Sequence, residues 1–310
     1  MFDRVLDKDA LKIESIQRDI YRQAGVEVSV LRLDHFCPEL SGNKFFKLKY
    51  NIKAALDENS RCLLSFGGAY SNHIHALAYA AKVFELPVIG VIRGEQHNKL
   101  NPTLQDAKNW GMKLHFISRS DYRRRHDLSF LETLKAEFGP FFLIPEGGSN
   151  EAAVQGCEEL GQWLAKYCAD VDSVFLPCAT GGTLAGIIAG AGFNQQVNGI
   201  SVLKGADHLQ QDIEALLVNK TASPWKIWHQ FHCGGYAKFD VALARFIDCF
   251  YQDTGLLIEP IYSGKMFFAI EQLLLQRQLP RGSKILAIHT GGLQGLRGMQ
   301  KRLAAIQAIA

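Results

Sequence analysis

Short, largely apolar segments alternate with amphipathic segments along most of this chain. Segments 61–66, 87–92 and 173–177 are mainly apolar, and segment 72–85 carries apolar residues at helical spacing. Strands that are apolar on both faces and are joined by single helices are typical of parallel sheets covered by helices on each side. The sequence therefore predicts an α/β fold with mostly parallel sheets.

The other expected elements continue the same alternation. We expect further strands at 113–117, 141–144, 198–203 and 284–288. We expect further helices at 102–110, at 151–166 and from Thr183 onward. No Pro- or Ser-rich linker and no internal repeat interrupts the pattern, and a length of 310 residues suggests about two domains.

The charge and hydropathy of the chain exclude two classes of partner. Lys and Arg number 34 against 31 Asp and Glu, which gives a net charge of only +3. The densest basic run, at 123–126, is short and is followed by Asp127, so we interpret it as a solvated surface. No segment approaches the roughly 18 consecutive apolar residues of a membrane helix. We therefore expect no nucleic acid and no membrane among the partners.

The cysteines and histidines show no pattern of covalent or metal cross-links. The seven cysteines are scattered without a Cys-x-x-Cys pair, and the ten histidines lack a metal-binding spacing. An odd number of scattered cysteines argues against a disulfide framework and favours a reducing compartment. We therefore expect a cytoplasmic protein without a metal site.

Glycine pairs follow four of the apolar segments. They are Gly67-Gly68, Gly147-Gly148, Gly181-Gly182 and Gly291-Gly292. In open α/β sheets, ligands bind beyond the carboxyl ends of the strands. Four glycine-rich turns at such ends indicate one crowded ligand site.

The turn after the strand at 173–177 combines Gly181 and Gly182 with the hydroxyls of Thr180 and Thr183. Glycines let backbone N–H groups approach an anion, and a helix start supplies unpaired donors and a partial positive charge. The turn is therefore a candidate phosphate site. It matches neither the nucleoside-triphosphate loop nor the dinucleotide motif Gly-x-Gly-x-x-Gly. A tight turn that only packs the helix on the sheet is the alternative.

A second motif lies at 42–47. Asn43 is a candidate helix cap, and Lys44 and Lys47 then lie three residues apart on one helix face. Two lysines in this arrangement can bind one ligand, with one amine at a reactive carbonyl group and the other at a phosphate. Ordinary solvent-exposed lysines are the alternative.

A third motif follows Gly67-Gly68, where Ser71 and Asn72 begin a helix. Free N–H groups and a serine hydroxyl at a helix N-terminus suit a carboxylate. An ordinary Ser/Asn cap is the alternative, although it does not explain the glycine pair before it.

The order of these motifs resembles the fold-type II pyridoxal-phosphate enzymes, which share the fold of the tryptophan synthase β subunit. The chain is most similar to the branch that contains 1-aminocyclopropane-1-carboxylate deaminase and D-cysteine desulfhydrase. That branch reads Gly-Asn-Lys-x-Arg-Lys-Leu-Glu-Tyr where this chain has Gly-Asn-Lys-Phe-Phe-Lys-Leu-Lys-Tyr at 42–50. It reads Asp-Pro-Val-Tyr-x-Gly-Lys where this chain has Glu-Pro-Ile-Tyr-Ser-Gly-Lys at 259–265.

The resemblance implies two open three-layer αβα domains with pyridoxal 5'-phosphate in the cleft between them. The large domain would comprise residues 1–50 plus 146–310, and the small domain residues 51–145. The resemblance also implies a homodimer, the common assembly in this family. For the cofactor, the resemblance implies that Lys44 forms the Schiff base, that Lys47 and the turn at 180–183 bind the phosphate, and that Asn72 meets the 3-hydroxyl group.

The resemblance also implies which residues meet the substrate, a small amino acid. Ser71 would lie beside its carboxylate and α-carbon, and Tyr236 and Tyr262 would reach it, with core or rim positions as the alternative for each tyrosine. Ser263 would face the ring nitrogen of the cofactor, and a small turn residue before Gly264 is the alternative. The desulfhydrases of the family have small hydroxyl residues at the positions of Ser263 and Thr290, whereas the deaminases have Glu and Leu.

We therefore expect a pyridoxal-phosphate-dependent D-cysteine desulfhydrase, which forms pyruvate, ammonia and hydrogen sulfide by β-elimination. Deamination of 1-aminocyclopropane-1-carboxylate is the alternative within the same class. A pyridoxal-phosphate carrier without turnover is the alternative in another class, and a dinucleotide-binding protein is disfavoured by the missing glycine motif. The chain departs from the branch at Phe46, where the branch has Arg, and at 151–153, and these departures concern the substrate rather than the cofactor.

Overall fold

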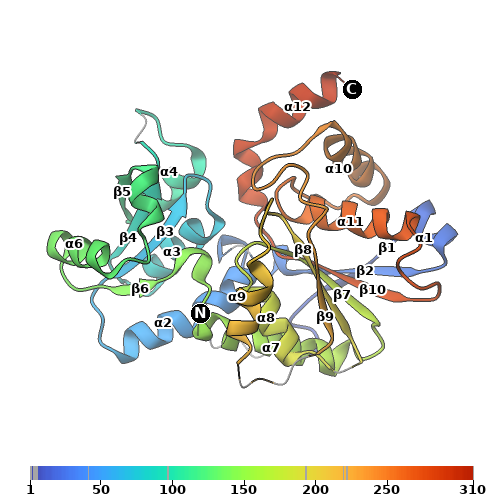
Figure 1. The fold of residues 1–310 in the computed structure, drawn as a ribbon, viewed down its shortest axis with the longest axis horizontal. Coiled ribbons are helices and arrows are strands. Elements are labelled where there is room, and N and C mark those ends of the chain that lie inside the picture. Colours follow the sequence, from blue (N-terminus) through green and yellow to red (C-terminus); the bar gives the residue numbers. More distant parts are fainter. Residues whose placement is uncertain are drawn as a thin grey trace.

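The computed structural model describes residue 2 and residues 6–40, 42–95, 98–192, 194–218, 220 and 223–309. Within these residues the backbone forms two sheets, which stand side by side with helices around each (Figure 1). The smaller sheet lies on the left of the view and the larger sheet on the right.

The larger sheet combines strands from both ends of the described chain. Its six strands stand in the order β1 (Ile13–Ile16), β2 (Glu27–Arg32), β10 (Lys284–His289), β7 (Ser173–Cys178), β8 (Gln196–Ser201) and β9 (Trp225–Trp228). Neighbouring strands are parallel except β1, which runs antiparallel to β2.

The smaller sheet has four strands, and all its neighbours are parallel. Their order is β5 (Lys113–Ile117), β4 (Val88–Arg93), β3 (Leu63–Gly68) and β6 (Phe142–Ile144). The prediction of an α/β fold with mostly parallel sheets is therefore confirmed. Each strand expected from the sequence forms within two residues of its expected bounds.

Helices connect or flank the strands. The α-helices are α1 (Asp19–Ala24), α2 (Asn43–Asp57), α3 (Asn72–Val83), α4 (Pro102–Asn109), α5 (Arg119–Arg123), α6 (Leu128–Phe138), α7 (Glu151–Tyr167), α8 (Gly182–Gly190), α9 (Leu209–Leu216), α10 (Val241–Thr254), α11 (Ser263–Leu275) and α12 (Gln300–Ile309). The short 3-10 helices are η1 (Leu33–His35), η2 (Pro38–Leu40), η3 (Glu146–Gly148) and η4 (Leu293–Gly298).

Successive residues of the buried strands pack on opposite faces of each sheet. In β3, Leu63 belongs to the apolar cluster that includes α3, whereas Leu64 packs in the cluster that includes α6. In β7, Val174 packs on the side of α8 and Phe175 on the side of α11. Each sheet is therefore covered by helices on both faces, which explains why its central strands are apolar throughout.

The predicted division into 1–50 plus 146–310 and 51–145 stays a prediction. All strands of the smaller sheet lie between residues 63 and 144, and the predicted boundary at residue 50 falls inside α2. No helix in the described part of the chain is long and apolar enough to cross a membrane.

Candidate active site

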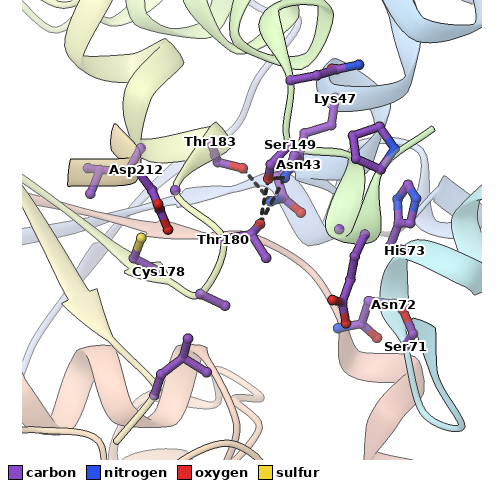
Figure 2. A pocket seen from close by; sticks show the side chains of 18 of the residues that line it. Asn43, Lys47, Ser71, Asn72, His73, Ser149, Cys178, Thr180, Thr183 and Asp212 are labelled. Carbon is purple, nitrogen blue, oxygen red and sulfur yellow. Dashed lines mark hydrogen bonds between the residues drawn. The ribbon is translucent and has the colours of Figure 1, made fainter. Parts of the chain in front are cut away.

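A cavity of about 850 Å³ lies where the carboxyl ends of strands from both sheets meet (Figure 2). Its wall includes Gly68 at the end of β3, Gly147 after β6, Gly181 after β7 and Gly291 after β10. The structure thus brings the four glycine-rich turns together, in the place where open α/β sheets bind ligands. The predicted site residues line this cavity except Gly182 and Ser263.

Asn43 connects α2 to the turn at 180–183, called the threonine turn below. The sequence suggested that Asn43 caps α2, and this is wrong: the cap position belongs to Gly42, and Asn43 is the first helical residue. Its buried side chain faces α8 instead, donating a hydrogen bond to Thr183 Oγ1 at 2.8 Å and accepting one from Lys44 Nζ at 3.1 Å. The amide therefore joins the start of α2 to the start of α8.

The ammonium group of Lys47 lies among hydroxyl groups. Lys47 Nζ donates to Ser149 Oγ at 2.8 Å and lies 3.5 Å from Thr180 Oγ1, and the two hydroxyls are 2.6 Å apart (Figure 2). No carboxylate within the described ranges forms an ion pair with this lysine, whose side chain is almost fully buried. A buried cation needs a counter-charge. The cluster therefore suits a bound anion.

A side chain is disfavoured at both glycines of the threonine turn, but the structural cause differs between them. Gly181 has a φ of 78°, a left-handed conformation that favours glycine. Gly182 has ordinary helical geometry, but a Cβ atom there would lie 2.9 Å from Ser149 Oγ and 3.2 Å from Lys47 Nζ. Because the first turn of α8 also leaves backbone N–H groups without helical acceptors, the space beside Gly182 is a cradle for an anion.

Lys44 carries an amine that is reactive near neutral pH. Burial, helped by the charge of Lys47, lowers its pKa to about 7, and burial lowers the pKa of Lys47 to about 8. A large fraction of Lys44 is therefore unprotonated at neutral pH and nucleophilic toward a carbonyl carbon. Lys47, with the higher pKa and the hydroxyl partners, keeps its positive charge more readily.

These lowered pKa values predict how the stability of the cofactor-free protein depends on pH. Between about pH 7 and pH 10 the unfolded chain keeps a proton on Lys44 that the folded chain releases, so the free energy of unfolding rises with pH. From Lys44 alone we expect a rise of roughly 1.5 kcal/mol between pH 7 and about pH 8.5. Calorimetry of the wild type and of Lys44→Met measures it.

The variant should show a smaller rise, because only Lys47 and other buried lysines then contribute. The buried thiol of Cys157 does not interfere in this window, since its pKa is raised to about 11 and its effect begins above the pKa of an unfolded thiol. An equal rise in both proteins would show that Lys44 is protonated in the folded state.

Ser71 and Asn72 lie at the junction of β3 and α3. Ser71 is the N-cap, and its hydroxyl accepts a hydrogen bond from the backbone N–H of Ile74 at 3.2 Å. The side chain of Asn72 accepts a hydrogen bond from Gln294. This contact ties the smaller sheet to the segment after β10, and the sequence motifs did not single out Gln294.

His73 is the second residue of α3 and is almost fully buried. Its Nε2 atom forms a hydrogen bond with Ser65 Oγ at 2.9 Å. Burial and the charges of Lys44 and Lys47 hold its pKa well below the usual value. The imidazole is therefore neutral, and it adds no charge to the two lysines beside it.

Two tyrosines form another part of the wall. The rings of Tyr236 and Tyr262 are nearly perpendicular, with their centroids 6.1 Å apart, and both residues line the cavity. Their loops are far apart in the sequence, one after β9 and the other before α11. The structure thus places both predicted tyrosines in the site.

Ser263 and Thr290 differ in their positions. Thr290 lines the cavity, and its carbonyl oxygen accepts a hydrogen bond from the backbone N–H of Asn43 at 3.2 Å. Ser263 is fully buried at the first position of α11, where its hydroxyl donates to Glu259 Oε1 at 3.1 Å. The predicted contact of Ser263 with the ring nitrogen of a cofactor stays a prediction.

Comparison with known proteins gives relatives of similar length. The chain is 28% identical over 292 residues to a putative 1-aminocyclopropane-1-carboxylate deaminase of Pyrococcus abyssi, covering 89% of this chain and 88% of that protein. It is 28% identical over 305 residues to the mitochondrial bifunctional D-cysteine desulfhydrase/1-aminocyclopropane-1-carboxylate deaminase of Arabidopsis thaliana, covering 91% and 76%.

A solved structure described as an ACC deaminase homologue superimposes with a TM-score of 0.83 and 26% identity, covering 96% of this chain and 93% of that chain. This likeness confirms the fold that the motif order implied. The family described as "Pyridoxal-phosphate dependent enzyme" matches residues 17–291. Since the match spans nearly the whole of both sheets and all four glycine-rich turns, the chain belongs to this family of pyridoxal-phosphate-dependent enzymes.

Proposed function

We propose that the protein is a lyase that removes the β-substituent of a small amino acid, and that D-cysteine is its substrate. The observation that carries the proposal is Lys44, an amine whose pKa is lowered to about 7 on the wall of a cavity that also holds an anion cradle. A lysine of this kind serves both as a nucleophile toward a carbonyl group and as a base.

The residues of the cavity fit pyridoxal phosphate. The phosphate would lie beside Gly182, held by Lys47, Ser149 and the N-terminus of α8, because that cradle is the space that a Cβ atom at Gly182 would fill. The amine of Lys44 would hold the aldehyde carbon. When bound, the cofactor supplies the electron sink for cleavage of a bond at the α-carbon.

The chain itself would bind the substrate and move its proton. The N-terminus of α3, with the hydroxyl of Ser71, would bind the carboxylate. Asn72, held by Gln294, would face the 3-hydroxyl group of the cofactor. Lys44, once displaced by the amine of the substrate, would take the α-proton, since its lowered pKa suits a base at neutral pH.

The overall reaction balances without an oxidant or a reductant. D-cysteine and one water give pyruvate, ammonia and hydrogen sulfide, and the α-proton taken by Lys44 is available for the products. Tyr236 and Tyr262, which also line the cavity, would orient the substrate.

The choice of D-cysteine over the cyclopropane acid rests on Thr290, which lines the cavity, and on the predicted contact of Ser263 with the ring nitrogen, although the hydroxyl of Ser263 donates to Glu259 in the structure. A glutamate beside the ring nitrogen can hold a proton there, whereas a hydroxyl forms a neutral hydrogen bond worth about 0.5–1.5 kcal/mol. Opening an unactivated cyclopropane needs the stronger electron sink, and expelling a thiolate from the β-carbon does not. The relatives named after either reaction are about equally similar to this chain.

An assay of pyruvate release tests this proposal. We expect clear release of pyruvate and sulfide from D-cysteine, and little release of α-ketobutyrate, the deaminase product, from the cyclopropane acid. L-cysteine and D-serine in the same panel report the stereochemistry and the leaving group. A higher kcat/KM for the cyclopropane acid would favour the deaminase, and no turnover of any of these amino acids would favour a carrier.

The proposal also includes a homodimer in the cytoplasm. The described part of the chain contains no disulfide bond, which suits a reducing compartment. Light scattering of the purified holoenzyme measures the mass of the assembly, and a mass of one chain would contradict the dimer.

A further inference from the structure

Lys265 is a buried lysine that has no role in the proposed reaction. It lies in the first turn of α11 with 0% of its surface exposed. Its ammonium group donates to the carbonyl oxygen of Gly235 at 2.7 Å and lies 3.5 Å from that of Val202. Neither partner is a carboxylate. Burial of this ammonium group is costly and is offset only in part by the charges of Glu259 and Asp240, so its contact with the carbonyl of Gly235 calls for a structural explanation.

The loop that Lys265 holds has an unusual backbone. Cys233, Gly234, Gly235 and Ala237 have φ values of 47°, 92°, 110° and 55°, all in the left-handed region. Non-glycine residues in this region cost free energy and persist only where surrounding contacts hold them. Tyr236, which lines the cavity, stands in the middle of this strained segment.

Tyr262 is held by the segment that leads into the first turn of α11. The carboxylate of Glu259 accepts hydrogen bonds from the backbone N–H groups of Ile261, Tyr262 and Ser263 at 2.7, 2.8 and 2.7 Å. These bonds hold the residue before α11, Tyr262, in one backbone conformation. Lys265 therefore projects from a rigid turn that also carries the ring packed against Tyr236.

We propose that Lys265 is a positioning residue: by holding the carbonyl of Gly235 it fixes the strained loop and keeps Tyr236 against Tyr262 in the wall of the cavity. The inference rests on the proposed function for the role of Tyr236 toward the substrate. Burial lowers the pKa of Lys265 to about 8, and the amine remains a hydrogen-bond donor in either protonation state.

Hydrogen exchange of the holoenzyme tests the structural part without any substrate. In Lys265→Met, which keeps an unbranched side chain one atom shorter and removes the donors, the amide of Lys238 should exchange at least about tenfold faster, because its acceptor is the same carbonyl of Gly235. Exchange in α8 and the affinity for pyridoxal phosphate should stay unchanged. Unchanged exchange at Lys238 would overturn the inference, whatever the substrate proves to be.

A double-mutant cycle tests the functional part. Lys265→Met should lower kcat/KM about tenfold or more in the wild-type background and less than about threefold in Tyr236→Phe, because two residues that act through one another are not additive. Equal losses in both backgrounds would show that Lys265 does not act through Tyr236. If the wild type does not release pyruvate from D-cysteine, the proposed function fails, and the exchange measurement still decides the role of Lys265.

Phe267→Leu serves as the matched control for lost packing. This residue is fully buried on the same helix, and its ring packs against that of Phe250. The control should lower the melting temperature and leave both kcat/KM and the exchange of Lys238 unchanged. Should Lys265→Met fail to fold, Lys265→Gln provides a shorter neutral donor for the same measurements, with a smaller loss expected.

Discussion

A Lys44→Ala protein should be colourless as purified and should release pyruvate from D-cysteine at least on the order of 10³-fold more slowly than the wild type. The substitution removes the amine whose pKa burial lowers to about 7. We expect that Lys47 does not replace it, because its ammonium group is held by the hydroxyls of Ser149 and Thr180. Absorbance of the cofactor and pyruvate release measure the two effects.

Lys47→Ala is the matched control, since it removes an ammonium group of equal size from the same face of α2. It should weaken the binding of pyridoxal phosphate but leave a yellow protein at high cofactor concentration. Borohydride treatment of the wild type should fix the pyridoxyl group on the peptide that contains Lys44. Full turnover by Lys44→Ala would remove the basis of the proposed mechanism.

Most of the strands that the sequence predicts are buried on both faces, and the edge strands β5 and β6 of the smaller sheet are the exceptions. β3, β4 and β7 are apolar on each side, so a run of apolar residues is enough to indicate them. The sequence analysis missed β1, β2 and β9, which lie at the edges of the larger sheet or next to one. β2 mixes Glu27, Ser29 and Arg32 with apolar residues, so its pattern resembles that of a short surface segment.

The site could be predicted where a local motif carries the chemistry. Lys44, Ser71 and the turn at 180–183 stand next to glycines at strand or helix ends, and the structure brings them to one cavity. Ser149 could not be found in this way, because its partner Lys47 is 102 residues away in the sequence. The same holds for Lys265, whose role appears only when its contact with the loop of Gly235 is seen.

Asn43 shows how a local rule fails in a packed site. Asparagine before a helix is an ordinary cap, and the sequence offers no reason to choose otherwise. In the structure the side chain of Asn43 bonds to Thr183 on another helix. The backbone N–H of Asn43 already finds an acceptor in the carbonyl of Thr290, so the start of α2 is held by neighbouring loops rather than by its own cap.

Gly182→Ala should weaken the binding of pyridoxal phosphate by about tenfold to a hundredfold, the loss expected when one or two charge-assisted hydrogen bonds to the phosphate are disturbed. The new methyl group would enter the space next to Ser149 and Lys47. Without cofactor both side chains can move aside, and alanine favours the helix, so the cofactor-free variant should be as stable as the wild type. Titration with pyridoxal phosphate and thermal unfolding measure the two quantities.

Gly181→Ala should give the opposite result, which makes the pair decisive. Alanine at a φ of 78° is strained, and its Cβ atom would lie 2.8 Å from Ile213 on α9, outside the cradle. Stability should fall by about 1 kcal/mol, and cofactor affinity should change less than in Gly182→Ala. Gly192→Ala, where a Cβ atom meets only Ala165 at 3.8 Å, should change neither quantity. If Gly182→Ala lost stability and kept its affinity, the turn would serve packing alone, because a phosphate seated beside Gly182 cannot share that space with a methyl group.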